Sequence, residues 1–62
     1  MSAVERQTLA REVSTKMLEL SKLINQLSPY YNEGFIRECL ELHSQMLEHE
    51  AVSISELEGF NS

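Results

Sequence analysis

Residues 27–34 of the chain read Leu-Ser-Pro-Tyr-Tyr-Asn-Glu-Gly, and they separate two long stretches with a helical pattern. Proline disfavours helical geometry in the residue before it, so the first helix should end near Leu27. Asn32 is the preferred N-cap of a second helix, because a start at Ser28 would place Gly34 inside that helix. The sequence therefore predicts two helices joined by a turn at residues 28–32.

The first helix is predicted over residues 2–27. Ser2 and Glu5 have the spacing of a capping box, in which each side chain accepts a bond from an unpaired backbone N–H of the first turn. Proline and glycine are absent from this stretch. Its apolar residues recur at spacings of three and four, which is a heptad pattern, at Ala10, Val13, Met17, Leu20, Ile24 and Leu27.

The second helix is predicted over residues 33–50, with a broad apolar face. His43 and Glu50 interrupt this face where leucine would be expected. Either they lie at its edge with their charged ends in water, or they form a polar pair that fixes the register of a bundle or contacts a partner. Residues 51–62 bring β-branched residues and serines that weaken a helix, so this tail is predicted as a short extra helix or a flexible end.

A chain of 62 residues forms one small domain, residues 1–62, and two helices alone seldom complete a core. We therefore expect an all-α antiparallel hairpin that is completed as a dimeric four-helix bundle or by a partner protein. The predicted dimer or bundle seam consists of Val13, Met17, Leu20, Ile24, Leu27, Ile36, Leu40 and Leu47.

The charge is divided unevenly along the chain. Residues 1–31 carry four basic and three acidic side chains, whereas residues 32–62 carry one basic and seven acidic ones, which together give the net charge of −5. An acidic half repels phosphates, so nucleic acid is an unlikely partner, and a basic or apolar groove of another protein is favoured. The longest apolar runs are too short to span a membrane. One free cysteine without a signal peptide favours a cytoplasmic location.

The sequence offers no catalytic, cofactor or metal site that we can predict. Cys39 and His43 are four residues apart on one helix face, and Glu50 follows one heptad later, but a structural zinc needs four ligands. Cys39 also lies within the apolar stripe, where a buried thiol is common. We expect a protein that is not an enzyme and carries no cofactor.

The aromatic residues and the tail are candidates for a partner-binding surface. Three of the four aromatic residues gather near the turn, where they either form a contact surface or plug the end of the hairpin. In the tail, apolar residues recur every third position and could dock in a groove of a partner. The predicted partner-binding residues are Tyr30, Tyr31, Phe35, His43, Glu50, Ile54, Leu57 and Phe60.

Residues 44–48 read Ser-Gln-Met-Leu-Glu and resemble the Ser-Gln-Glu-Leu-Asp motif of the sporulation-type aspartyl-phosphate phosphatases. Methionine replaces the glutamate of the motif, and Glu48 replaces its aspartate; the chain contains no aspartate. Residues 19–25 resemble the latter half of the same motif, with Ser21 at the aspartate position. The resemblance implies a regulator that removes phosphate from response regulators.

The length, the hairpin layout and the cysteine early in the second helix are similar to the plasmid copy-number Rop protein. That resemblance implies RNA binding by a dimer through Arg6, Arg11, Lys16 and Lys22, although Ala10, Ser14 and Leu18 stand where that family's RNA-binding face has other residues. Size and acidity also resemble the small co-chaperones of type III secretion. Our prediction is a small regulator, inhibitor or co-chaperone that acts by helix-mediated protein–protein binding, with the phosphatase and the RNA-binding hairpin as alternatives.

Overall fold

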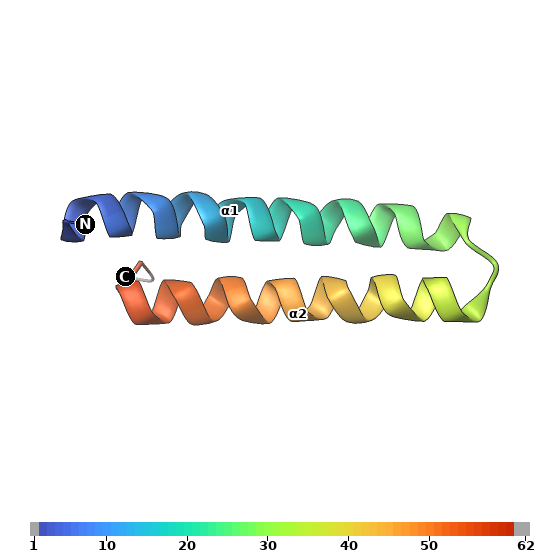
Figure 1. The fold of residues 1–62 in the computed structure, drawn as a ribbon. Helices are drawn as coiled ribbons and strands as arrows, with labels where there is room; N and C mark the ends of the chain where they lie inside the picture. Colours follow the sequence, from blue (N-terminus) through green and yellow to red (C-terminus); the bar gives the residue numbers. More distant parts are fainter. Residues whose placement is uncertain (1, 61–62) are drawn as a thin grey trace.

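The computed structural model describes residues 2–60 and confirms an all-helical hairpin (Figure 1). Helix α1 spans Ala3–Leu27, the 3-10 turn η1 spans Ser28–Tyr30, and helix α2 spans Gly34–Glu58. The hairpin measures 46 × 19 × 15 Å with a radius of gyration of 14.1 Å. A compact domain of this length would have a radius of about 11 Å, so the molecule is a rod with a large surface for its mass.

Helix α1 begins as the sequence predicts. The Ser2 side chain accepts a hydrogen bond from the Glu5 backbone N–H at 3.1 Å, which satisfies one of the unpaired donors of the first turn. The helix then runs without interruption to Leu27, where the proline two residues later ends it.

The turn starts with a single 3-10 turn that has Pro29 near its beginning, where a missing N–H costs nothing. The Tyr31 N–H donates to the Ser28 carbonyl oxygen at 3.1 Å and closes this turn. The extended residue before α2 is Glu33, one residue later than the predicted cap Asn32, and no side chain caps this end. Gly34 is therefore the first residue of α2 and is not inside it.

Helix α2 continues eight residues beyond Glu50, through most of the stretch that the sequence assigned to a tail. Ser53 donates its hydroxyl to the His49 carbonyl oxygen at 2.9 Å, so this serine fits within the helix. Ala51 is buried and Ile54 half-buried, and this packing outweighs the weak helix propensity of the segment. Gly59, with φ of 72°, ends the helix in the left-handed conformation.

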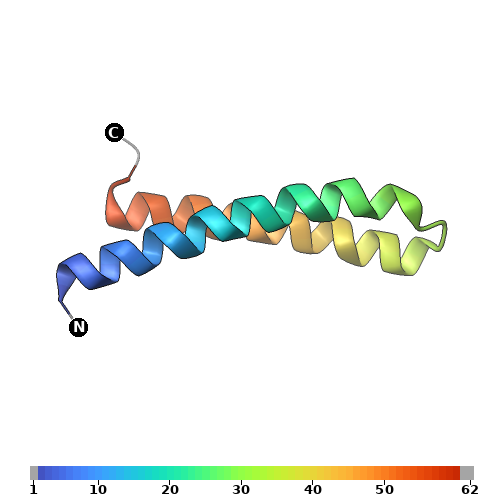
Figure 2. The same ribbon diagram turned by 90° about the horizontal axis from the view of Figure 1, so that it is seen from above.

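The two helices contact each other through small side chains. Ser14, Ser21 and Ser28 are buried at intervals of seven residues, and Ser44 and Ala51 repeat the same interval on α2. Small residues at the contact allow the helix axes to approach closely along their whole length. Seen from above, α1 and α2 cross at a shallow angle and stay side by side (Figure 2). We call these five residues the small-residue seam.

Within residues 2–60, neither helix is long and apolar enough to cross a lipid bilayer.

Candidate functional site

Side chains from both helices, all of them apolar except His43 and Glu50, form one face beside the small-residue seam. Its inner rows are half-buried, and its outer rows are exposed at the edges. The inner rows are Ala10, Met17 and Ile24 on α1 and Leu40, Leu47 and Ile54 on α2; the outer rows are Val13, Leu20 and Leu27 on α1 and Ile36, His43, Glu50 and Leu57 on α2. We call this set the apolar face. Each row repeats every seven residues, so each keeps one side of its helix.

Two grooves along this face show that α1 and α2 build it together. The central groove is lined by Leu20 and Ile24 of α1 and by His43, Met46, Leu47 and Glu50 of α2. The second groove lies at the open end of the hairpin and is lined by Arg6, Leu9, Ala10 and Val13 of α1 and by Ile54, Leu57 and Glu58 of α2. The two grooves therefore follow the apolar face from the middle of the rod to its open end.

The predicted bundle seam lies on the apolar face. Met17, Ile24, Leu40 and Leu47 are half-buried beside the interhelical contact. The other four predicted residues keep substantial exposed area, at 43% for Val13, 48% for Leu20, 44% for Leu27 and 37% for Ile36. The sequence did not single out the residues that the helices bury between them, because these are small and mostly polar.

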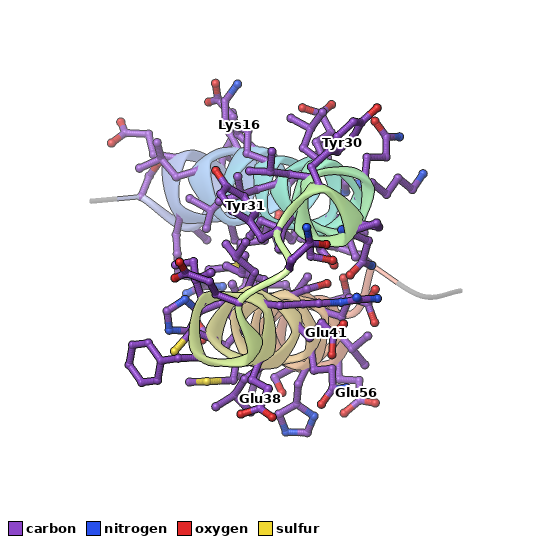
Figure 3. The ribbon with its side chains drawn as sticks, turned by 90° about the vertical axis from the view of Figure 1, so that its right-hand side faces the viewer. Lys16, Tyr30, Tyr31, Glu38, Glu41 and Glu56 are labelled. Carbon is purple, nitrogen blue, oxygen red and sulfur yellow. The ribbon has the colours of Figure 1, made fainter. Side chains whose placement is uncertain are left out.

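The predicted partner-binding residues fall into three places. His43 and Glu50 lie together in the central groove, and Ile54 and Leu57 line the groove at the open end. The aromatic residues of the turn lie apart from these, with Tyr30 84% and Phe35 81% exposed. Tyr30 points away from α2 in the view along the rod (Figure 3), so it does not plug the end of the hairpin.

Phe60 packs within the chain. The guanidinium carbon of Arg11 lies 4.1 Å from the centre of the Phe60 ring, in the geometry of a cation–π contact. Nearby, Arg6 Nε lies 3.2 Å from a carboxylate oxygen of Glu58. These two contacts hold the last turn of α2 against the start of α1, and they occupy two of the four basic side chains in the first half of the chain.

A polar groove lies on the other flank of the hairpin. It is lined by Asn25, Ser28, Pro29, Arg37, Glu41, Ser44, Gln45 and Glu48. Arg37 Nε and Glu41 Oε1 form an ion pair at 3.3 Å along α2. Figure 3 shows Glu41 at this flank, whereas Lys16 points outward from α1 and Glu38 and Glu56 point outward from α2. The outer surfaces of both helices therefore carry charged groups, but exposed apolar side chains also lie outside the apolar face, at Val4, Leu18, Leu42 and Val52.

Glu48 takes part in a hydrogen-bond network that crosses the seam. Ser21 Oγ lies 2.8 Å from Ser44 Oγ and 3.0 Å from Glu48 Oε1. The Ser44 hydroxyl can also donate to the Ser21 carbonyl oxygen, at 3.3 Å. A carboxylate only accepts, so one consistent arrangement has Ser44 donating to Ser21 and Ser21 donating to Glu48. The Ser21 side chain is completely buried, which makes this network a structural link between the helices.

The chemistry for a metal centre is limited in the part of the chain that the structure describes. Among residues 2–60, no three His, Cys or Glu side chains come together in a group that could hold a metal ion. Cys39 is a half-buried free thiol on α2.

Comparison with protein-family models, with curated proteins and with solved structures finds no match for the chain. In structural terms, the protein is a two-helix hairpin with a polar seam between the helices and an apolar face on one side.

Proposed function

We propose that this chain is a small, non-enzymatic, protein-binding hairpin that acts as a regulator or adaptor of the inhibitor or co-chaperone type. Its apolar face is buried against another protein chain, and this burial is the binding event. The observation that carries the proposal is the apolar face itself, whose outer rows stay exposed along both helices.

The exposed area supports the proposal. The hairpin exposes 4913 Å². A folded monomer of the same mass is expected to expose about 4,100 Å², so the rod exposes about 800 Å² more than a compact monomer would. On the apolar face, five large apolar side chains are each more than one-third exposed: Val13, Leu20, Leu27, Ile36 and Leu57. Contiguous exposed apolar groups on a soluble protein often mark a binding surface. The apolar face is therefore best explained as a surface that a second chain covers.

The acidic second half supports a choice of partner surface. Seven of its glutamates lie on or next to α2 with a single basic residue among them. The negative electrostatic potential of these glutamates speeds the association of the chain with a basic surface and slows its association with an acidic one. For a partner of a different sequence, we therefore propose an apolar groove with basic residues at its border.

A pair of cross-linking variants tests this proposal. A photo-reactive amino acid that replaces Leu20 would lie on the apolar face. The matched control places the same photo-reactive amino acid at Thr15, which is exposed and lines a groove formed by α1 alone. In the cells from which the sequence comes, we expect discrete protein adducts from position 20 and few from position 15. Equal labelling from both positions, or no adduct from position 20, would contradict the proposal.

The polar groove favours a second candidate, a phosphatase-like regulator. Gln45 and Glu48, which belong to the segment that resembles the phosphatase motif, line this groove together with Asn25 and Arg37. If the groove acts on a phosphorylated receiver domain, the chain should release phosphate from that domain. Changing Gln45→Ala or Glu48→Gln should abolish the release, and Glu38→Gln, on the outward side of α2, should not. No release above the spontaneous rate would remove this candidate.

A further inference from the structure

We infer that the apolar face is covered by a second copy of the same chain, with α2 antiparallel on the partner's α2, so that His43 of each copy faces Glu50 of the other. This inference rests on the proposed function, because it names the protein that the apolar face binds. Three features of the hairpin support it: the polar side chains on the face, their position along α2, and the area of the face.

His43 and Glu50 are the two ionisable side chains among the residues that define the apolar face. Both line the central groove, next to Leu20 and Ile24. Neither forms an ion pair with another of the described residues. Covering this groove with a purely apolar surface would remove water from the Glu50 carboxylate and the His43 imidazole and leave both without a hydrogen-bond partner, which is costly. An occupant that avoids this cost supplies a hydrogen-bond acceptor near His43 and a donor near Glu50.

A second copy supplies both groups. His43 and Glu50 are seven residues apart in the same outer row, and a two-fold interface makes every contact reciprocal. With the two-fold axis between them, the partner's Glu50 lies opposite His43, and the partner's His43 lies opposite Glu50. The same axis places Ile36 opposite the partner's Leu57, so the rest of this row makes apolar contacts.

The position of the pair along α2 fits a full overlap of two hairpins. His43 lies nine residues after Gly34, the first residue of α2, and Glu50 lies eight residues before Glu58, the last. An axis between them therefore passes through the middle of α2, and both rods overlap from end to end. At the open end of the hairpin, Glu58 forms an ion pair with Arg6 of the same chain. Neither of these two residues therefore places an unpaired charge in the interface.

The same charges argue against the other symmetric arrangement, in which α1 lies on the partner's α2. The α1 residues that line the central groove beside His43 and Glu50 are Leu20 and Ile24. In that arrangement His43 and Glu50 would face apolar residues of α1 and would gain no hydrogen-bond partner. The polar pair therefore favours α2 on α2 and α1 on α1.

The area is sufficient for a stable dimer. A standard specific interface buries about 800 Å² on each partner. One long side of the rod measures 46 × 19 Å, which is about that area in projection.

Charge-swap variants test the inference by sedimentation equilibrium. His43→Glu alone places two carboxylates opposite each other, and Glu50→Lys alone removes the hydrogen-bond acceptor opposite His43 and leaves an ammonium group without a counter-charge. Each change occurs twice in the dimer, so we expect each single variant to raise the dimer Kd by about tenfold or more. An equimolar mixture of the two variants should form a mixed dimer about as tightly as wild type, because the carboxylate introduced at position 43 faces the ammonium introduced at position 50.

His49→Glu and Glu56→Lys are the matched controls, since His49 and Glu56 are also seven residues apart on α2 and are exposed. They make the same charge changes and should leave the dimer Kd within about threefold of wild type. Circular dichroism of each variant verifies that it is helical.

The possible results separate this inference from the proposed function. If neither single variant raises the dimer Kd above that of the wild type, the inferred arrangement is wrong. It is also wrong if a mixture of the two variants does not recover the wild-type affinity. A wild-type chain that stays monomeric at millimolar concentration would overturn the second copy as the occupant. The proposed function fails separately, when a photo-reactive residue at Leu20 gives no protein adduct.

Discussion

Ser21 Oγ and Ser44 Oγ lie 2.8 Å apart where the two helices meet, with Glu48 Oε1 3.0 Å from Ser21 Oγ. The centre of the interhelical contact is therefore polar, small and fully hydrogen-bonded. The larger apolar side chains of the heptad rows therefore lie beside the seam and not within it. The packing inside the hairpin thus creates the apolar face outside it.

Enlarging the seam should separate the helices. Ser21 is completely buried, so Ser21→Leu inserts a side chain for which the contact has no space. We expect a loss of about 1–3 kcal/mol in the free energy of unfolding, measured by urea denaturation.

Ser21→Ala is the matched control, since it removes the hydroxyl without adding volume. It should cost about 1 kcal/mol, because Ser44 and Glu48 each lose one hydrogen-bond partner. Ser14, whose hydroxyl bonds to the Arg11 carbonyl oxygen of its own helix, should tolerate Ser14→Ala with a smaller loss. If Ser21→Leu were neutral, the close packing at this seam would be refuted.

The two glycines should respond to alanine in opposite directions. Gly59 has φ of 72°, a conformation that costs an L-residue about 1–2 kcal/mol, so Gly59→Ala should destabilise the end of α2. Gly34, the first residue of α2, has open space around its Cα, so Gly34→Ala should stabilise the protein by about 0.5 kcal/mol. Thermal melts of the two variants check this, and a shift of the same sign for both would contradict the assigned end of α2.

The contact between Arg11 and Phe60 should couple the last turn of α2 to the first half of α1. A double-mutant cycle with Arg11→Met and Phe60→Leu should give a coupling energy of about 0.5–1 kcal/mol, the range for an exposed cation–π pair. Hydrogen exchange should show faster opening near residues 55–58 in both single variants. Additive effects of the two substitutions would mean that the ring and the guanidinium do not interact.

The helices and the turn could be predicted from the sequence, because their signals are local. Ser2, Pro29 and the heptad pattern of α1 act within a few residues of where they stand. The length of α2 could not be predicted from local signals, because residues 51–58 have weak helix propensity and are stabilised by packing against α1. That contribution depends on residues about 40 positions away in the chain.

The candidate site was predictable in part. The heptad pattern identified the residues of the apolar face, but it assigned the seam to large apolar residues, since hydrophobic periodicity gives serine no weight. The repeat of Ser14, Ser21 and Ser28 at seven-residue intervals was the available signal for the real contact. The partner of Ser21 across the seam is set by how α2 aligns with α1, which no local pattern specifies.

The main inference is that a second copy of the same chain completes this hairpin along its apolar face. Its most direct test is the melting temperature of the isolated chain over a dilution series from about 1 mM to about 1 μM, with the mass determined on the same samples. The account predicts a dimer whose melting temperature falls on dilution, and a Leu20→Glu variant that is monomeric and only partly helical. A fully helical 7.1 kDa monomer that melts at one temperature at every concentration, with or without Leu20→Glu, would contradict it.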